Sequence, residues 1–307
     1  MIDLLFSNFS FRALWTPELI LILGVVGLLY LLLVEKWRHR FQDSTPVKVK
    51  QKIFFFLGLF MLYLGWGSPL YIAGHLMLTF HMFQMVFAYI CAVPLFILGT
   101  PKWVFQAIGR KLEGTTFVNY AKYVFNPLVA ILWFNGMFSI YHLPVVFDTL
   151  MKNVALHSLY EIGLLLGAFL MWWFMLAPLP MKGQLTDLRR MLYIFANGAF
   201  LTPACALIIF AGSPVYAVYS DPTTWAVVMA YCLPPGEMVP YQLLGENGFS
   251  PMSVHHDQQL AGVIMKVIQE IIYGVTIGYV FKQWVSKEKQ SDGPSISDIP
   301  VTHQIRS

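Results

Sequence analysis

Long apolar runs separated by short charged segments fill most of this chain of 307 residues. A membrane-spanning helix needs roughly 20 consecutive apolar residues, and about 17 is the practical minimum. Seven runs approach or exceed this length, and each predicts one helix. Their ranges are 19–34, 53–71, 75–98, 126–143, 157–177, 191–212 and 259–280. The pattern predicts an all-α fold, a polytopic transmembrane bundle of about seven helices.

The composition supports lipid as the solvent for most of the surface. Only 12% of the residues are charged and 57% are hydrophobic, whereas an average soluble domain carries about 25% charged residues. We predict one transmembrane helical domain over residues 1–286. Residues 287–307 are polar and contain Ser, Pro and Gly, so we expect a disordered cytoplasmic tail.

Lysines and arginines are distributed very unevenly between the two sides of the predicted bundle. Seventeen of the 20 fall on one side, only Arg12 and Lys152 fall on the other, and Lys266 lies inside the last helix. The positive-inside rule then places the N-terminus outside and the C-terminus in the cytoplasm. These charges mark topology, so the predicted partner is membrane lipid and not nucleic acid.

Histidines gather on the opposite, outer side. A lone histidine at a helix end is usually an interfacial residue, but imidazole is also the commonest metal ligand, and metals need clusters of such groups. The one-sided gathering therefore favours a shared metal or redox site. His39 and His303 are expected on the cytoplasmic surface. The six outer histidines are His75 at the start of the third helix, His81 about 9 Å deeper, His142 at the end of the fourth, His157 at the start of the fifth, and His255 and His256 just before the seventh.

Neighbouring side chains extend the possible ligand set. Met85 lies one helical turn after His81, and imidazole with thioether suits copper, particularly Cu(I). Glu161 lies one turn after His157 and, like Asp257, either binds a metal or orients an imidazole. The predicted metal ligands are His75, His81, Met85, His142, His157, Glu161, His255, His256 and Asp257, with copper as the expected metal.

Lys266 and Glu270 are four residues apart in the last helix, which predicts an ion pair. A Schiff-base lysine of the rhodopsin kind is disfavoured, because the third helix has no acidic counter-ion.

The segment 213–258 is too long for a simple loop, and we expect a short interfacial helix within 234–248.

Several stretches together resemble a known family, the CtaG family of cytochrome c oxidase assembly factors, of the Bacillus type. The longest is HLMLTFHMFQMVFAYICAVPLFILGTP, residues 75–101. It is followed by WFNGMFSIYHLP, which ends at Pro144, and by ALHSLYEIGLLLGAFLMWW, which contains His157 and Glu161. DQQLAG at 257–262, with Met265 after it, is similar to the family's final-helix motif.

The resemblance implies a multi-pass protein of the bacterial plasma membrane that helps to mature a haem–copper oxidase at a copper centre. It implies an assembly factor and not an enzyme, with oxidase subunits as partners. The family-type positions carried over are His75, His81, His142, His157, Glu161 and Asp257.

Three other functions remain open from the sequence. A transporter for copper or another small solute needs polar residues through to the cytoplasmic side, and after His81 the third helix offers only Gln84, Tyr89 and Cys91. A haem- or quinone-binding redox protein would use His81 and a facing histidine as axial ligands. A structural scaffold would satisfy its histidines by hydrogen bonds alone.

Overall fold

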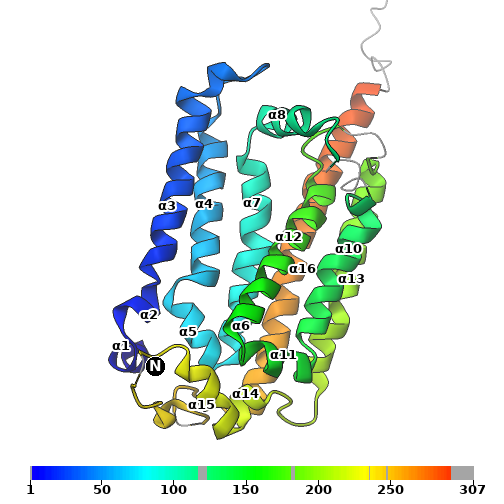
Figure 1. The fold of residues 1–307 in the computed structure, drawn as a ribbon. Helices are drawn as coiled ribbons and strands as arrows, with labels where there is room; N and C mark the ends of the chain where they lie inside the picture. Colours follow the sequence, from blue (N-terminus) through cyan, green and yellow to red (C-terminus); the bar gives the residue numbers. More distant parts are fainter. Residues whose placement is uncertain (1, 117–122, 181–183, 235, 247, 292–307) are drawn as a thin grey trace, which may run out of the picture.

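Helices joined by loops make up the computed structural model, which describes residues 2–116, 123–180, 184–234, 236–246 and 248–291. Within these residues six helices are long and apolar enough to span a membrane, and a seventh span is a helix pair bent by 81°. Each of the seven predicted runs overlaps one of them, so the predicted all-α transmembrane bundle is confirmed (Figure 1). The spans are Phe11–Lys36, Val49–Leu76, Leu78–Gly99, Pro127–Tyr141 with Pro144–Met151, Val154–Leu176, Asp187–Phe210 and Val254–Gln290.

The first half of the chain runs up and down through the blue and cyan part of the bundle (Figure 1). Its elements are α1 (Ile2–Asn8), α2 (Phe11–Trp15), α3 (Pro17–Leu31), η1 (Leu32–Lys36), η2 (Arg38–Arg40), α4 (Val49–Trp66), α5 (Pro69–Leu76), α6 (Leu78–Met85), η3 (Val86–Cys91), α7 (Ala92–Gly99) and α8 (Lys102–Leu112).

The second half completes the bundle and caps one end of it. Its elements are α10 (Pro127–Tyr141), α11 (Pro144–Met151), α12 (Val154–Leu176), α13 (Asp187–Phe210), α14 (Ala217–Ser220), α15 (Pro222–Ala230), η4 (Tyr241–Leu243) and α16 (Val254–Ser291).

Some predictions fall at or beyond the edge of the described residues. Helix α16 continues to Ser291, so the first residues of the expected disordered tail are helical. Residues 292–307, with His303 and Arg306, lie outside the described residues, and so do Lys122 and Lys182.

The predicted third helix, 75–98, is wrong at its start, because His75 belongs to the preceding helix. Ser68 caps α5 by accepting a hydrogen bond from the Leu70 amide, and Pro69 suits the first helical position. The backbone at Met77 is extended, with φ −142° and ψ 133°, and α6 begins only at Leu78. The third span therefore starts as a new helix directly after a break.

A π-helical segment directly precedes Pro94 in the third span. The Ala92 amide bonds to the Phe87 carbonyl five residues back, in η3, and the α-helix resumes with Pro94 in the first turn of α7. A proline there cannot donate to Ile90, and its ring would crowd that carbonyl in a regular α-helix. The wider turn leaves the Tyr89 carbonyl to accept from Trp172 Nε1 at 3.0 Å.

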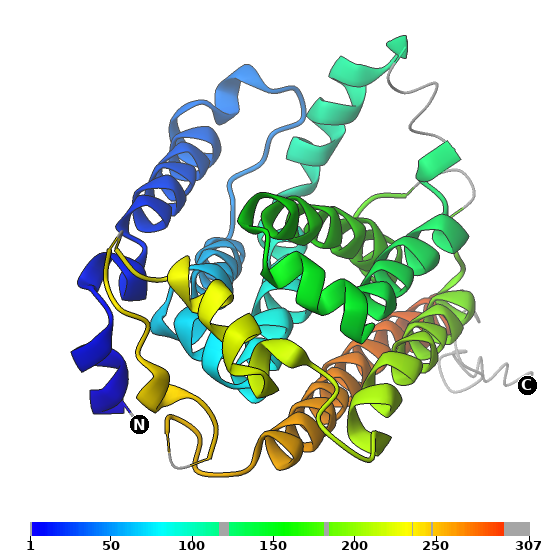
Figure 2. The same cartoon turned by 60° about the horizontal axis from the view of Figure 1, so that its bottom comes forward.

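A bend that the sequence did not predict divides the fourth span. Helix α10 ends at Tyr141, Leu143 is extended before Pro144, and α11 leaves at 81° to α10. The residue before a proline is biased away from helical geometry, which explains why the chain turns here. The turn places α11 across the end of the bundle (Figure 2).

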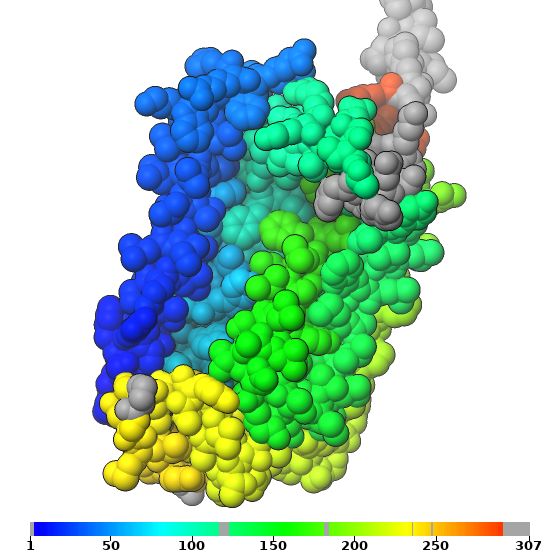
Figure 3. Space-filling model, viewed as in Figure 1, coloured from blue at the N-terminus to red at the C-terminus, as the bar shows by residue number. Residues whose placement is uncertain are grey.

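The segment between α13 and α16 forms a cap over the same end. Helices α14 and α15 lie across the lower ends of the spans in Figure 1, and the yellow surface in Figure 3 closes that end beside α11 and α12. Trp225 of α15 is fully buried in an apolar cluster with Leu14 and Ile72. The interfacial helix expected within 234–248 is only the short 3-10 turn η4.

At the opposite end, the buried Arg190 joins three spans. Its guanidinium donates to the Met175 and Leu176 carbonyls at 2.9 and 3.0 Å, where α12 ends. It also donates to Asp187 Oδ1 at 2.9 Å and to Gln283 Oε1 of α16 at 3.1 Å. One side chain thus satisfies the last carbonyls of α12 and ties them to α13 and α16.

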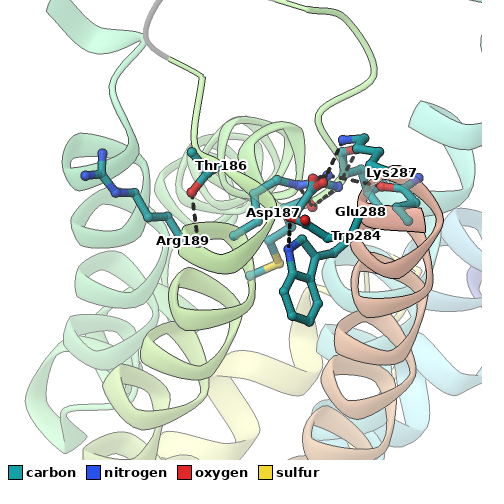
Figure 4. A network of polar contacts seen from close by, with 10 residues as sticks. Thr186, Asp187, Arg189, Trp284, Lys287 and Glu288 are labelled. Atoms are coloured by element: carbon teal, nitrogen blue, oxygen red, sulfur yellow. Dashed lines mark hydrogen bonds and ion pairs between the residues drawn. The ribbon is translucent and has the colours of Figure 1, made fainter. Parts of the chain in front are cut away.

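Figure 4 shows how Asp187 connects this network to the end of α16. Lys287 reaches Asp187 Oδ2 at 2.6 Å, while Trp284 Nε1 donates to Glu288 on the same helix. Arg189, the next residue to Arg190, is exposed and directs its side chain away from the network.

We predict that Arg190→Ala lowers the free energy of unfolding by about 3–5 kcal/mol, because Asp187 and two helix-terminal carbonyls lose a buried partner. Thermal unfolding of the purified protein in mild detergent measures the effect. Arg189→Ala is the matched control and should melt with the parent protein. Equal melting of both variants would contradict the assigned role of Arg190.

Candidate functional site

Two buried histidines from different spans face each other under the cap. His81 of α6 is 3% exposed, and His142, directly after α10, is 1% exposed. Their ring centroids lie 6.1 Å apart. The Nε2 atom of each has no hydrogen-bond partner among the residues that the structure describes. Two imidazole nitrogens are therefore left available in one buried place.

The tautomer of His142 follows from its other nitrogen. Its Nδ1 lies 2.7 Å from the Phe138 carbonyl oxygen, which can only accept a hydrogen bond. Nδ1 therefore carries the hydrogen and donates it, and in neutral imidazole the Nε2 lone pair is then unprotonated. Metal-binding histidines are commonly oriented by a carbonyl in this way.

Tyr141 links this pair to a third histidine. Its hydroxyl shares a 2.7 Å hydrogen bond with Nε2 of the buried His157, and its ring stacks on His81 with centroids 5.6 Å apart and planes within 8°. The Met151 sulfur lies 4.0 Å from the same hydroxyl. His81, Tyr141, His142 and His157 are called the histidine cluster below.

The bend after α10 places α11 against the histidine cluster. Phe147 of α11 is fully buried, and its ring meets that of His81 edge-on at 5.2 Å. In the cap, the Tyr216 hydroxyl donates to the His142 carbonyl at 2.8 Å, and the Tyr219 hydroxyl donates to the Gly74 carbonyl at 2.6 Å. Burial raises the pKa of both tyrosines, and the nearby Asp148 adds to the effect at Tyr216, so both hydroxyls stay protonated donors.

Asp148 of α11 holds the cap at a second point. Its two carboxylate oxygens accept from the Ala217 and Val218 amides, at 3.0 and 3.1 Å. These amides begin α14, where a helix has unsatisfied donors. Gln258 of α16 adds a third tie, because its Oε1 accepts from the Val215 amide at 2.8 Å.

Three other predicted ligands lie near the histidine cluster but make different contacts. His75, in the last turn of α5, donates from Nδ1 to the Tyr71 carbonyl at 2.9 Å. Met85 is buried in the main apolar core one turn from His81. Glu161 is partly buried, and its backbone carbonyl accepts from the Tyr89 hydroxyl at 3.4 Å.

The predicted ligands at 255–257 lie in the first turn of α16, not before it. His255 donates from Nε2 to the Ala211 carbonyl at 2.9 Å, and the exposed His256 shares a 3.0 Å hydrogen bond between Nδ1 and Ser253 Oγ. Neither histidine joins His81 and His142 in the ring contacts of the described residues.

Asp257 caps a helix. Its Oδ2 accepts from the Leu78 amide at 2.7 Å and its Oδ1 from the Thr79 amide at 3.3 Å, while the Thr79 hydroxyl donates to the Asp257 carbonyl at 3.2 Å. The carboxylate is 3% exposed and lies at the positive end of the α6 dipole. Asp257 thereby fixes where α6 begins, and with it the position of His81 one turn further on.

The nine predicted ligands are thus not gathered as one set. Across the described ranges, no group of three or more His, Cys, Asp or Glu side chains is arranged to hold a metal ion. What the structure brings together is His81 with His142, and His157 through Tyr141. The roles of Tyr141, Asp148, Tyr216 and Gln258 were missed, and only Tyr141 stood beside a recognised histidine in the sequence.

Asp257→Ala is expected to lower the free energy of unfolding by about 1–3 kcal/mol, because the buried Leu78 and Thr79 amides lose a charged acceptor. Asp257→Asn keeps one acceptor oxygen and should lose less. Thermal melts in detergent give the comparison, with His256→Ala as the exposed neighbour that should change nothing. A parent-like melt of Asp257→Ala would refute the capping role.

A family model described as cytochrome c oxidase caa3 assembly factor (Caa3_CtaG) matches residues 28–287. No curated protein matches the chain, and no solved structure does. The matched residues include the second to sixth spans, most of the seventh, and every member of the histidine cluster. Since the match covers most of the chain, the protein belongs to the family of cytochrome c oxidase caa3 assembly factors.

Proposed function

We propose that this assembly factor holds copper as Cu(I) between His81 and His142 and delivers it to a subunit of cytochrome c oxidase. The observation that carries the proposal is the pair of buried imidazoles whose Nε2 atoms have no partner within the described residues. A buried polar atom without a partner costs free energy, so such atoms need an explanation. A metal ion bound by both nitrogens provides one.

The donor set fits a soft cation of low coordination number. Imidazole and thioether ligands suit Cu(I), and two methionines are buried close by, Met85 one turn from His81 and Met151 against Tyr141. Hard cations such as Mg²⁺ or Ca²⁺ prefer several oxygen ligands instead. We treat the copper as cargo, which the protein holds and passes on.

The surrounding residues control access to the two imidazoles. Phe147 and the stacked ring of Tyr141 exclude water from His81, and the Phe138 carbonyl fixes the ring of His142. Asp257 of α16 accepts from the Leu78 amide and so sets where α6 begins. The cap lies over the histidine cluster, so exchange of the ion with a recipient requires the cap to move.

The charge pattern supports an outward-facing site. The elements that carry the histidine cluster lie at one end of the bundle. The cation-bearing segments η1 and η2 after α3, helix α8 and the last turns of α16 lie at the other (Figure 1). By the positive-inside rule the cation-rich end faces the cytoplasm. We therefore place the histidine cluster at the outer face of a bacterial plasma membrane, with oxidase subunits as partners.

We expect the protein purified in mild detergent, with copper and a reductant, to retain stoichiometric copper. His81→Ala combined with His142→Ala should abolish it, because both available Nε2 atoms are lost. Elemental analysis measures the copper, and thermal melts check that the variant is folded. His255→Ala with His256→Ala is the matched control and should keep its copper. Unchanged stoichiometry in the first double variant would overturn the proposal.

Tyr216→Phe combined with Tyr219→Phe should accelerate copper transfer to a Cu(I) chelator roughly tenfold, because two buried hydrogen bonds that hold the cap are lost. The rate is followed by the absorbance of the chelator complex. Tyr231→Phe removes an exposed hydroxyl that bonds to the Lys152 carbonyl and serves as the control. Equal rates in all three proteins would show that the cap does not limit access.

A further inference from the structure

A charged pair lies at the middle of the last span, and part of it faces the lipid. The Lys266 ammonium and the Glu270 carboxylate are 2.5 Å apart, which confirms the predicted ion pair. Along α16, Glu270 lies about 21 Å from His256 and about 18 Å from Lys282, at about 1.5 Å per residue. The hydrocarbon core of a bilayer is roughly 30 Å thick. Glu270 is therefore close to the bilayer midplane.

The two partners of this pair differ in how they are satisfied. Lys266 donates to the Gly198 carbonyl at 3.0 Å and to Gln269 Oε1 at 3.1 Å besides its contact with Glu270, so three acceptors surround its ammonium. Its side chain is 25% exposed, whereas that of Glu270 is 58% exposed. A carboxylate can accept several hydrogen bonds. Within the ion pair, the hydrogen-bonding capacity left unused therefore belongs to the Glu270 carboxylate, which can still accept.

A cavity of about 370 Å³ opens beside the carboxylate, between α13 and α16. Small residues on both helices, Gly198 and Ala199 on one and Gly274 on the other, leave the room. Phe195 and Tyr273 add aromatic walls. A volume of this size, with mostly apolar walls and one charged pair, is typical of a small-molecule site.

The depth of the cavity selects the kind of molecule that can use it. Phospholipid headgroups stay at the interface, so they cannot reach a carboxylate at the midplane. Charged solutes do not dissolve in hydrocarbon. An uncharged, lipid-soluble ring compound with hydroxyl groups can enter from the side, place its ring against the aromatic walls and donate to Glu270.

We infer that the cavity between α13 and α16 binds a membrane-dissolved quinol or a similar lipophilic aromatic alcohol, with a hydroxyl donating to Glu270. This site is separate from the histidine cluster, and the inference does not depend on copper. It also differs from the quinone alternative considered for the sequence, which placed the ligand at His81.

The probe is decylubiquinol, kept reduced under anaerobic conditions, with the full-length protein in lipid nanodiscs. Quinol retained after size-exclusion chromatography is extracted and quantified, and empty nanodiscs give the background from partition into lipid. The protein should retain quinol above this background. The oxidised quinone should be retained about tenfold less at equal concentration, because it has no hydroxyl to donate to the carboxylate.

Two glycines of α16 provide matched variants. Gly274 lines the cavity and Gly278 does not, yet a Cβ atom added at either would meet no atom of another described element within 4 Å. Gly274→Leu should fill the cavity and abolish quinol retention, while Gly278→Leu should retain quinol like the parent. Glu270→Gln, which keeps the shape but weakens the acceptor, should retain several-fold less.

Three results would overturn the inference: quinol retention no greater than in empty nanodiscs, equal retention in Gly274→Leu and Gly278→Leu, or a change of oligomeric mass in Gly274→Leu, which would assign the cavity to a protein helix. Copper content measured on the same samples should be unchanged in all variants. Failure of the quinol site is therefore distinguishable from failure of the copper site.

Discussion

Polar groups inside a membrane have no water to bond with, and this constraint organises the protein. Each interruption of a span frees backbone amides or carbonyls that must find partners within the chain. At the break before α6 the partner is Asp257, and at the end of α12 it is Arg190. Both come from a different helix than the one they complete. The polar side chains buried at the ends of the bundle therefore also fix how its helices are joined.

Against this background, the Nε2 atoms of His81 and His142 are two of the eight buried side-chain atoms without a partner among the described residues, and they lie together. The neighbouring polar groups are satisfied: the Tyr141 hydroxyl by His157, the Gln258 amide by the Ile208 carbonyl, and the Thr79 hydroxyl by Asp257. The surrounding contacts hold both imidazoles in place and leave one nitrogen of each for a ligand. The proposed uptake and release of a metal ion needs such an arrangement, since a fully satisfied pair would have no site to offer.

The sequence predicted the spans well because apolar length alone defines them. It also predicted that six histidines share one end of the bundle, because the Lys- and Arg-rich segments and the histidines lie at opposite ends of successive helices. It failed where one contact between distant residues decides the local structure. The sequence around Met77 does not predict a break in the helix, because the carboxylate that stabilises the break belongs to Asp257. The prolines at 94 and 144 were visible, but neither the π-turn nor the 81° bend follows from them alone.

The candidate site was predictable in its members more than in its arrangement. Of nine expected ligands, three lie in the histidine cluster. The residue that joins them is Tyr141, whose phenol is not among the usual metal ligands and was therefore not predicted. His255 and His256 carried the same signal as His81, yet they contact a loop carbonyl and a serine. The apolar pattern of the sequence predicts which residues lie at a helix end, but it does not predict which residue of another helix each of them contacts.

The bond between Asp257 and the start of α6 also has a consequence for biosynthesis. The carboxylate follows the Leu78 amide by 179 residues, so the third span must enter the membrane with the first amides of its helix lacking this acceptor. Only when the last span inserts is that end completed. The position of His81 is therefore fixed late in synthesis, and a chain truncated before α16 would keep six spans while the start of α6 lacked its acceptor.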